Sequence, residues 1–71
     1  MLPISFRGLL IRVHLDQIAS CAWMAMATIE DPATAESAPV ALPDVHPTPR
    51  AAVIQVVAEA RARIRRGSWR N

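Results

Sequence analysis

The chain has 71 residues, one cysteine and a formal net charge of +2, and thirteen of its many hydrophobic residues are alanines. This length excludes more than one small domain, and the lone Cys21 excludes an internal disulfide. His14, His46 and Cys21 are too far apart in sequence to resemble a zinc motif, so we expect no metal and no cofactor.

The charge is distributed unevenly along the chain. All eight basic residues are arginines, and the net charge is +1 over residues 1–29, −4 over residues 30–48 and +5 over residues 49–71. The longest stretch without a charged residue is 17–29, which is shorter than the roughly 20 residues that a membrane-spanning helix needs. A single thiol is typical of a reducing compartment, and we expect a cytoplasmic protein.

Residues 1–8 contain Pro3 and Gly8 and show no hydrophobic period, so we expect an irregular N-terminus. Two patterns compete over residues 9–29. Apolar and polar residues alternate over residues 11–16, which is typical of a strand, whereas a stripe with helical spacing extends over about twenty residues. We predict a helix over about 9–29, with partial strand as the open alternative. The helical stripe consists of Ile11, Leu15, Ile18, Ala22, Met26 and Ile29.

Residues 30–48 are rich in proline and acidic residues. Five of the six prolines lie within residues 32–49, and Pro32 disfavours helical geometry at Asp31. This composition predicts an extended linker that resembles polyproline II.

Residues 49–66 give the strongest helix signal in the chain. Thr48 is a good N-cap, Pro49 is suited to the first helical position, and Gly67 is a typical stop signal. Residues 67–71 would form a short tail. The apolar stripe of this predicted helix consists of Val53, Val56, Val57, Ala60 and Ile64.

These elements together predict an all-α fold in which two amphipathic helices, about 9–29 and 49–66, are joined by the extended linker. A short isolated helix is marginal in water, so each stripe must be buried against another surface. We expect a helical hairpin, self-association or docking onto a larger protein. The residues predicted to contact a partner are Val53, Val56, Val57, Ala60, Ile64, Ile11, Leu15, Ile18 and Trp69.

The C-terminal arginines form a second candidate site. A basic helix end followed by Trp69 is compatible with phosphate backbones or an anionic membrane surface, although arginine is also favoured at a helix C-terminus. The predicted anion-binding residues are Arg61, Arg63, Arg65, Arg66 and Arg70.

No residue combination indicates catalysis. Cys21 has no neighbouring cation to activate its thiol, and His46 lies in the predicted linker. The sequence therefore favours a bacterial or phage protein that is not an enzyme. We expect an accessory or regulatory protein, such as a subunit of a complex or a phage-type inhibitor, that binds a larger protein or itself. Nucleic-acid association is the first alternative, and a peripheral membrane helix is the second.

Overall fold

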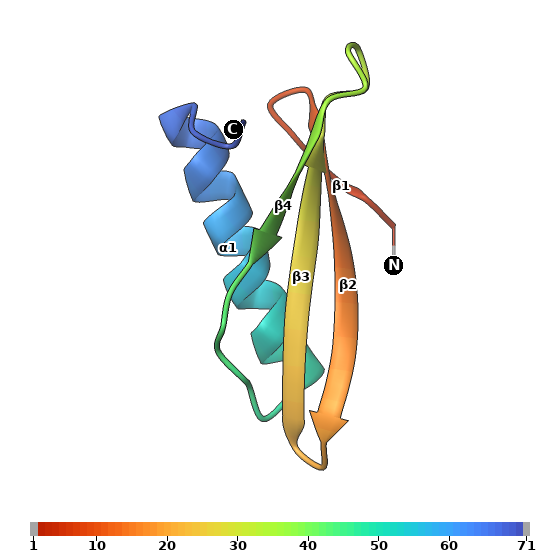
Figure 1. The fold of residues 1–71 in the computed structure, drawn as a ribbon, viewed down its shortest axis with the longest axis vertical. Helices are drawn as coiled ribbons and strands as arrows, with labels where there is room; N and C mark the ends of the chain where they lie inside the picture. Colours follow the sequence, from red (N-terminus) through yellow and green to blue (C-terminus); the bar gives the residue numbers. More distant parts are fainter. Residues whose placement is uncertain (1, 71) are drawn as a thin grey trace.

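The computed structural model describes residues 2–70, and it consists of four strands followed by one helix (Figure 1). The strands form one antiparallel sheet in the order β1-β2-β3-β4, so neighbours in sequence are neighbours in the sheet. The helix lies across one face of this sheet and contacts β2, β3 and β4. The elements are β1 (Ile4–Phe6), β2 (Leu9–Ala19), β3 (Ala22–Glu30), β4 (Ser37–Ala41) and α1 (Pro49–Arg66).

The predicted all-α fold is wrong, because residues 9–29 form a β-hairpin and the chain is mainly β-sheet. The strand alternation that is visible over residues 11–16 continues along both strands. Leu9 and Ile11 of β2 and Ala27 and Ile29 of β3 are buried, while most residues between them are more exposed. The predicted stripe combines residues from both faces of the sheet, since Ile11, Leu15 and Ile29 lie on the helix side and Met26 lies on the open face.

The turn between β2 and β3 has no sequence signal of the usual kind. Ser20 and Cys21 connect Ala19 to Ala22, and Cys21 adopts a left-handed conformation with a φ of 57°. Two-residue turns favour glycine or asparagine at such positions. Because neither residue is present here, the hairpin is difficult to recognise from sequence.

Residues 30–48, predicted as a linker, contain a turn and the edge strand β4. The Asp31 amide donates to the Glu36 carbonyl at 2.8 Å, and the Asp31 carboxylate accepts from the Ala33 amide at 2.9 Å. These bonds reverse the chain so that β4 pairs with β3. Part of the segment predicted to be a linker is therefore an edge strand of the sheet.

Helix α1 has the bounds that its capping residues indicate. The Thr48 side chain accepts a hydrogen bond from the Ala51 amide at 3.1 Å, and Pro49 begins the helix. Gly67 ends it in a left-handed conformation with a φ of 69°.

The core lies between α1 and the covered face of the sheet. Its largest fully buried side chains are Ile11, Ile29, Val40 and Val56. Alanines make up much of the remainder, and Ala27 and Ala60 are almost completely buried. Such small side chains allow a helix to pack closely on a sheet. The apolar stripe of α1 therefore packs against the sheet of the same chain and not against a second helix.

Candidate functional site

Most of the predicted partner-binding residues lie in this internal core. Ile18 is 59% exposed, while Leu15 and Val53 are partly buried. A partner surface must therefore be sought mainly among other residues. The predicted residues that are buried between α1 and the sheet, or at its end, are Ile11, Val56, Val57, Ala60, Ile64 and Trp69.

The outer edge of β2 is the longest unpaired strand edge among residues 2–70. Strand β1 pairs only with Leu9, Leu10 and Ile11, whereas β2 continues to Ala19. Figure 1 shows β1 beside one end of β2 and no strand beside the rest. Residues 12–19 therefore present a free edge along the sheet.

The hydrogen bonds of Trp23 show which backbone groups of this edge point outwards. Trp23 faces Gln17 across the β2–β3 ladder, but its amide and carbonyl both bond to His46, at 2.7 and 2.8 Å. Gln17 and Trp23 are therefore a non-hydrogen-bonded pair, and the backbone groups of Gln17 point away from β3. Because antiparallel pairs alternate, those of Val13 and Leu15 also point outwards.

The other strand edges are shorter or protected. The same alternation places the nitrogen of Pro39 at the outer edge of β4, where proline has no hydrogen to donate. Proline on an edge strand opposes pairing with another chain. Strand β1 has three residues, and Pro3 precedes it.

The face of the sheet opposite α1 adjoins the free edge and is partly apolar. His14, Met26 and Ala41 lie side by side on neighbouring strands in this face. Met26 is 44% exposed, and Met24 is partly buried. A partner on the β2 edge would have this surface within reach of its side chains.

The arginines of the predicted anion site divide into two groups in the structure. Arg63 and Arg66 both contact the Glu59 carboxylate, at 2.8 and 3.8 Å. Arg70 contacts Asp31 at 3.1 Å and Glu36 at 3.6 Å. Intramolecular carboxylates therefore balance these three positive charges.

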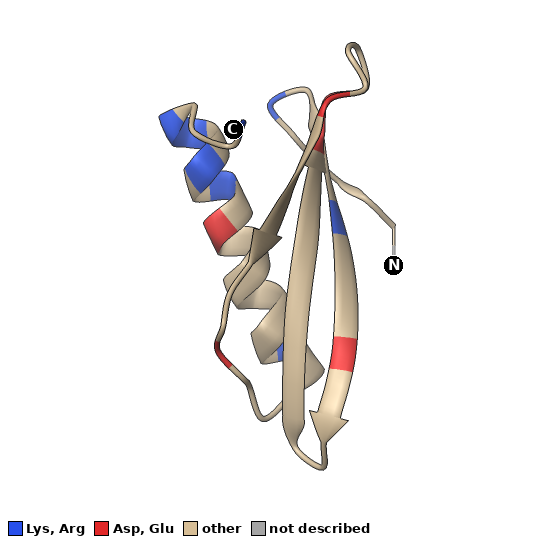
Figure 2. Ribbon diagram, viewed as in Figure 1, with Lys and Arg blue, Asp and Glu red and all other residues tan. Residues whose placement is uncertain are grey.

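Arg61 and Arg65 belong to a different cluster, together with Arg7. The guanidinium carbons of all three lie 5.5–5.7 Å from the centroid of the Phe6 ring. Figure 2 shows basic positions at the β1–β2 turn and along the last turns of α1. No carboxylate within residues 2–70 forms an ion pair with them. We call Arg7, Arg61, Arg65 and Phe6 the Phe6 cluster.

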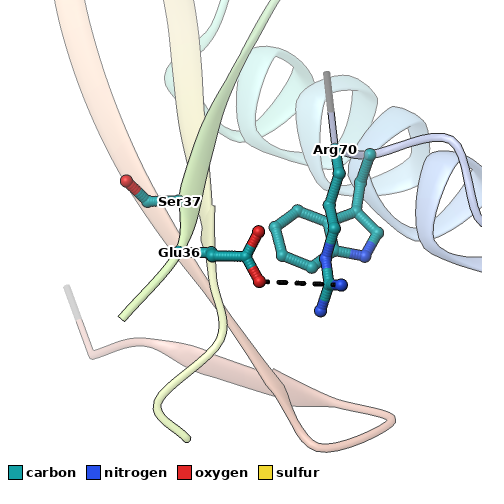
Figure 3. Close-up of a pocket in the computed structure, with 4 residues that line it drawn as sticks. Glu36, Ser37 and Arg70 are labelled. Carbon is teal, nitrogen blue, oxygen red and sulfur yellow. Dashed lines mark ion pairs between the residues drawn. The ribbon is translucent and has the colours of Figure 1, made fainter. Parts of the chain in front are cut away.

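A shallow pocket lies near the C-terminus, lined by Glu36, Ser37, Trp69 and Arg70 (Figure 3). The Arg70 guanidinium is 4.7 Å from the centroid of the Trp69 ring and pairs with Glu36. Trp69 itself is only 8% exposed. The ion pairs of Arg70 with Asp31 and Glu36 therefore hold the C-terminal segment against the sheet.

The residues considered for metal or thiol chemistry are separated in the structure. His14 lies on the open face of β2, Cys21 is exposed in the β2–β3 turn, and His46 bridges to Trp23. Within residues 2–70 no three Cys, His, Asp or Glu side chains are grouped as metal ligands would be. In the same part of the chain, no helix is both long and apolar enough to cross a membrane.

Sequence reasoning missed the β2 edge and two members of the Phe6 cluster, Arg7 and Phe6. A usable signal was present at the N-terminus. Arg7 and Gly8 separate Ile4 and Phe6 from Leu9 and Ile11, and alternating apolar residues around a two-residue turn are typical of a hairpin.

Comparison of this chain with protein families, with curated proteins and with solved structures finds no match in any of the three.

Proposed function

We propose that this chain is a small, non-catalytic accessory or regulatory protein of the cytoplasm that binds another protein through the free edge of β2. The binding mode would be strand addition, in which an extended segment of the partner continues the sheet. The observation that carries this proposal is the unpaired edge formed by residues 12–19.

The chemistry of the edge supports strand addition. Val13, Leu15 and Gln17 each direct an amide and a carbonyl outwards, so one added strand can form several regularly spaced backbone hydrogen bonds. The edges of most sheets are shortened, bulged or carry charges and proline, because free edges attract other chains. In this protein Pro39 protects β4, whereas the free edge of β2 has no proline, carries the charged Arg12 and Asp16, and is irregular only at its end, between Gln17 and Ala19.

The side chains of β2 indicate the partner's sequence pattern. Arg12, His14 and Asp16 project on the open face, and Val13 and Leu15 project towards the helix side. An added strand should therefore alternate polar and apolar residues, with a basic residue near Asp16, because Arg12 already pairs with Glu30 at 3.2 Å. At about 3.3 Å per residue, the eight-residue edge is about 25 Å long and accommodates a short strand.

Capture with the tagged full chain from bacterial extract tests the proposal. Three baits are compared: the unchanged chain, Gln17→Pro, and Gln17→Ala as the matched control. The proline variant removes the outward Gln17 amide and places a ring in the path of an added strand, whereas alanine keeps the amide. We expect proteins that the unchanged chain and Gln17→Ala retain and that Gln17→Pro loses.

Circular dichroism of each bait shows whether it is folded before the capture is interpreted. Retention of the same proteins by all three folded baits would contradict binding at the edge. Equal loss from Gln17→Ala and Gln17→Pro would point to the glutamine side chain instead of strand addition.

A further inference from the structure

The Phe6 cluster places three positive charges around one side chain, and no carboxylate among residues 2–70 pairs with any of them. Arg7 extends from the β1–β2 turn, while Arg61 and Arg65 lie one turn apart on α1. All three guanidinium carbons are within 5.7 Å of one ring centroid. The Phe6 ring attracts each cation through its face, but it carries no net charge to offset their mutual repulsion.

The neighbouring arginines Arg63 and Arg66 differ from those of the Phe6 cluster because they have a carboxylate partner. Arg63 and Arg66 come from the same turns of α1, and both pair with Glu59. The two groups of arginines therefore differ, because Arg63 and Arg66 share the Glu59 carboxylate while Arg61 and Arg65 have no carboxylate partner within residues 2–70.

Arg61 also has an unsatisfied donor. Its Nε atom is buried and has no hydrogen-bond acceptor within residues 2–70. Buried donors in folded proteins nearly always have an acceptor. An oxyanion bound beside these guanidinium groups would supply an acceptor oxygen that residues 2–70 do not provide.

The backbone of Arg7 adopts an unfavourable, left-handed conformation. Arg7 has a φ of 51° and Gly8 a φ of 79°, as in a two-residue turn that favours asparagine and glycine. A left-handed conformation is unfavourable for an arginine. The turn thus carries an unfavourable residue, and that residue places a third guanidinium beside Phe6.

We propose that Arg7, Arg61 and Arg65 bind a single phosphate group, either inorganic phosphate or the phosphate of a small phosphomonoester. Guanidinium groups match phosphate oxygens with paired, charge-assisted hydrogen bonds. All three guanidinium groups lie against the same ring, and Arg63, Arg66 and Arg70 already have carboxylate partners. The cluster therefore suits one phosphate better than the row of phosphates in a nucleic acid. The cluster lies beside the β1–β2 turn, at the end of β2 that is far from the β2–β3 turn (Figure 1). It includes none of residues 12–19, so this inference does not depend on the proposed function.

The test is an NMR titration of the isotopically labelled full chain at constant ionic strength. The probes are inorganic phosphate, glycerol 2-phosphate, a single-stranded oligonucleotide and vesicles that contain an anionic phospholipid. We expect saturable shifts at Phe6 and at the guanidinium groups of Arg7, Arg61 and Arg65 with at least one of the first two probes. The relative affinity of these two probes distinguishes free phosphate from a phosphomonoester.

Two double variants separate a built site from general positive charge. Arg61→Gln with Arg65→Gln should weaken phosphate binding by about tenfold or more, since each charge-assisted bond contributes strongly. Arg63→Gln with Arg66→Gln removes the same charge from the same turns and should leave the affinity within about twofold, because these arginines already pair with Glu59. Arg7→Gln provides a third variant if the first double variant does not fold.

Three results would overturn the inference. The first is the absence of saturable binding of either small phosphate probe. The second is an equal loss of affinity in the two double variants, which would show a general charge effect. The third is saturable binding of the oligonucleotide or the vesicles alone, which would assign the cluster to a polyanion or a lipid surface.

Discussion

His46 closes the edge of β3 by exchanging two backbone hydrogen bonds with Trp23, the amide of each donating to the carbonyl of the other. The bridge extends the protection of this side of the sheet beyond the end of β4. It also fixes the direction of the Gln17 backbone across the ladder. One side of the sheet is therefore closed by β4 and His46, while the β2 side is open beyond Ile11.

Proline substitutions along β2 should have effects that alternate with position. His14 forms a hydrogen-bonded pair with Met26, so His14→Pro removes a ladder bond and leaves a carbonyl of β3 unsatisfied. We expect His14→Pro to cost about 1–3 kcal/mol more stability than Gln17→Pro, whose amide points outwards. Urea denaturation of both variants measures the difference. Equal destabilisation would contradict the assigned strand directions.

Truncation at the centre of the core should be costly. Ile29 is completely buried between β2, β4 and α1, so Ile29→Ala should destabilise the protein by about 2–5 kcal/mol. The control is Ile54→Ala on the solvent side of α1, where the side chain is 54% exposed and the expected change is within about 0.5 kcal/mol. Thermal unfolding followed by circular dichroism compares the two. A larger effect at Ile54 would be incompatible with this packing.

We expect Trp69 to stabilise the fold of the isolated chain rather than to form an interface with a partner. Trp69 is only 8% exposed, so Trp69→Ala should cost about 3 kcal/mol through lost burial. Arg70→Gln removes the ion pairs with Asp31 and Glu36 at the surface and should cost less than about 1 kcal/mol. Intrinsic tryptophan fluorescence adds a direct check, because a buried Trp69 should be shielded from a polar quencher in the folded protein.

The helix was predictable because its signals are local. Thr48, Pro49 and Gly67 act within a few residues of the helix ends, and all three occupy the positions that the capping rules assign. The stripe of valines was also recognisable, but its partner was not. The sequence pattern shows that Val56 must be buried, and only the sheet register shows that β2 and β3 bury it.

The strands β2 and β3 could not be predicted in the same way, because their alanines favour a helix locally. Alanine is a strong helix former, yet Ala25 and Ala27 lie in β3, where small side chains let α1 pack closely. The Ser20–Cys21 turn has no glycine to mark the hairpin. Tertiary packing therefore overrides the local preference. The Phe6 cluster depends on contacts between residues more than fifty positions apart, which no local pattern reports.

Arg7→Asn should increase stability and weaken phosphate binding. Asparagine is more stable than arginine in a left-handed conformation, and Arg7 has a φ of 51°. We expect a gain of about 1 kcal/mol in the free energy of unfolding, together with weaker phosphate affinity. Urea denaturation and the phosphate titration measure the two effects on one variant. A loss of stability would show that the Arg7 contact with Phe6 outweighs its backbone cost.

Amide hydrogen exchange in the isolated full chain, measured by NMR at low protein concentration, tests the free edge of β2 most directly. Arg12, His14 and Asp16 should exchange slowly, because their amides bond to β3. Val13, Leu15 and Gln17 should exchange quickly, because theirs point to solvent, and they should become protected when a partner strand binds. Uniform slow exchange across residues 12–17 would contradict the account, since it would show that the edge is already paired or that the segment is helical.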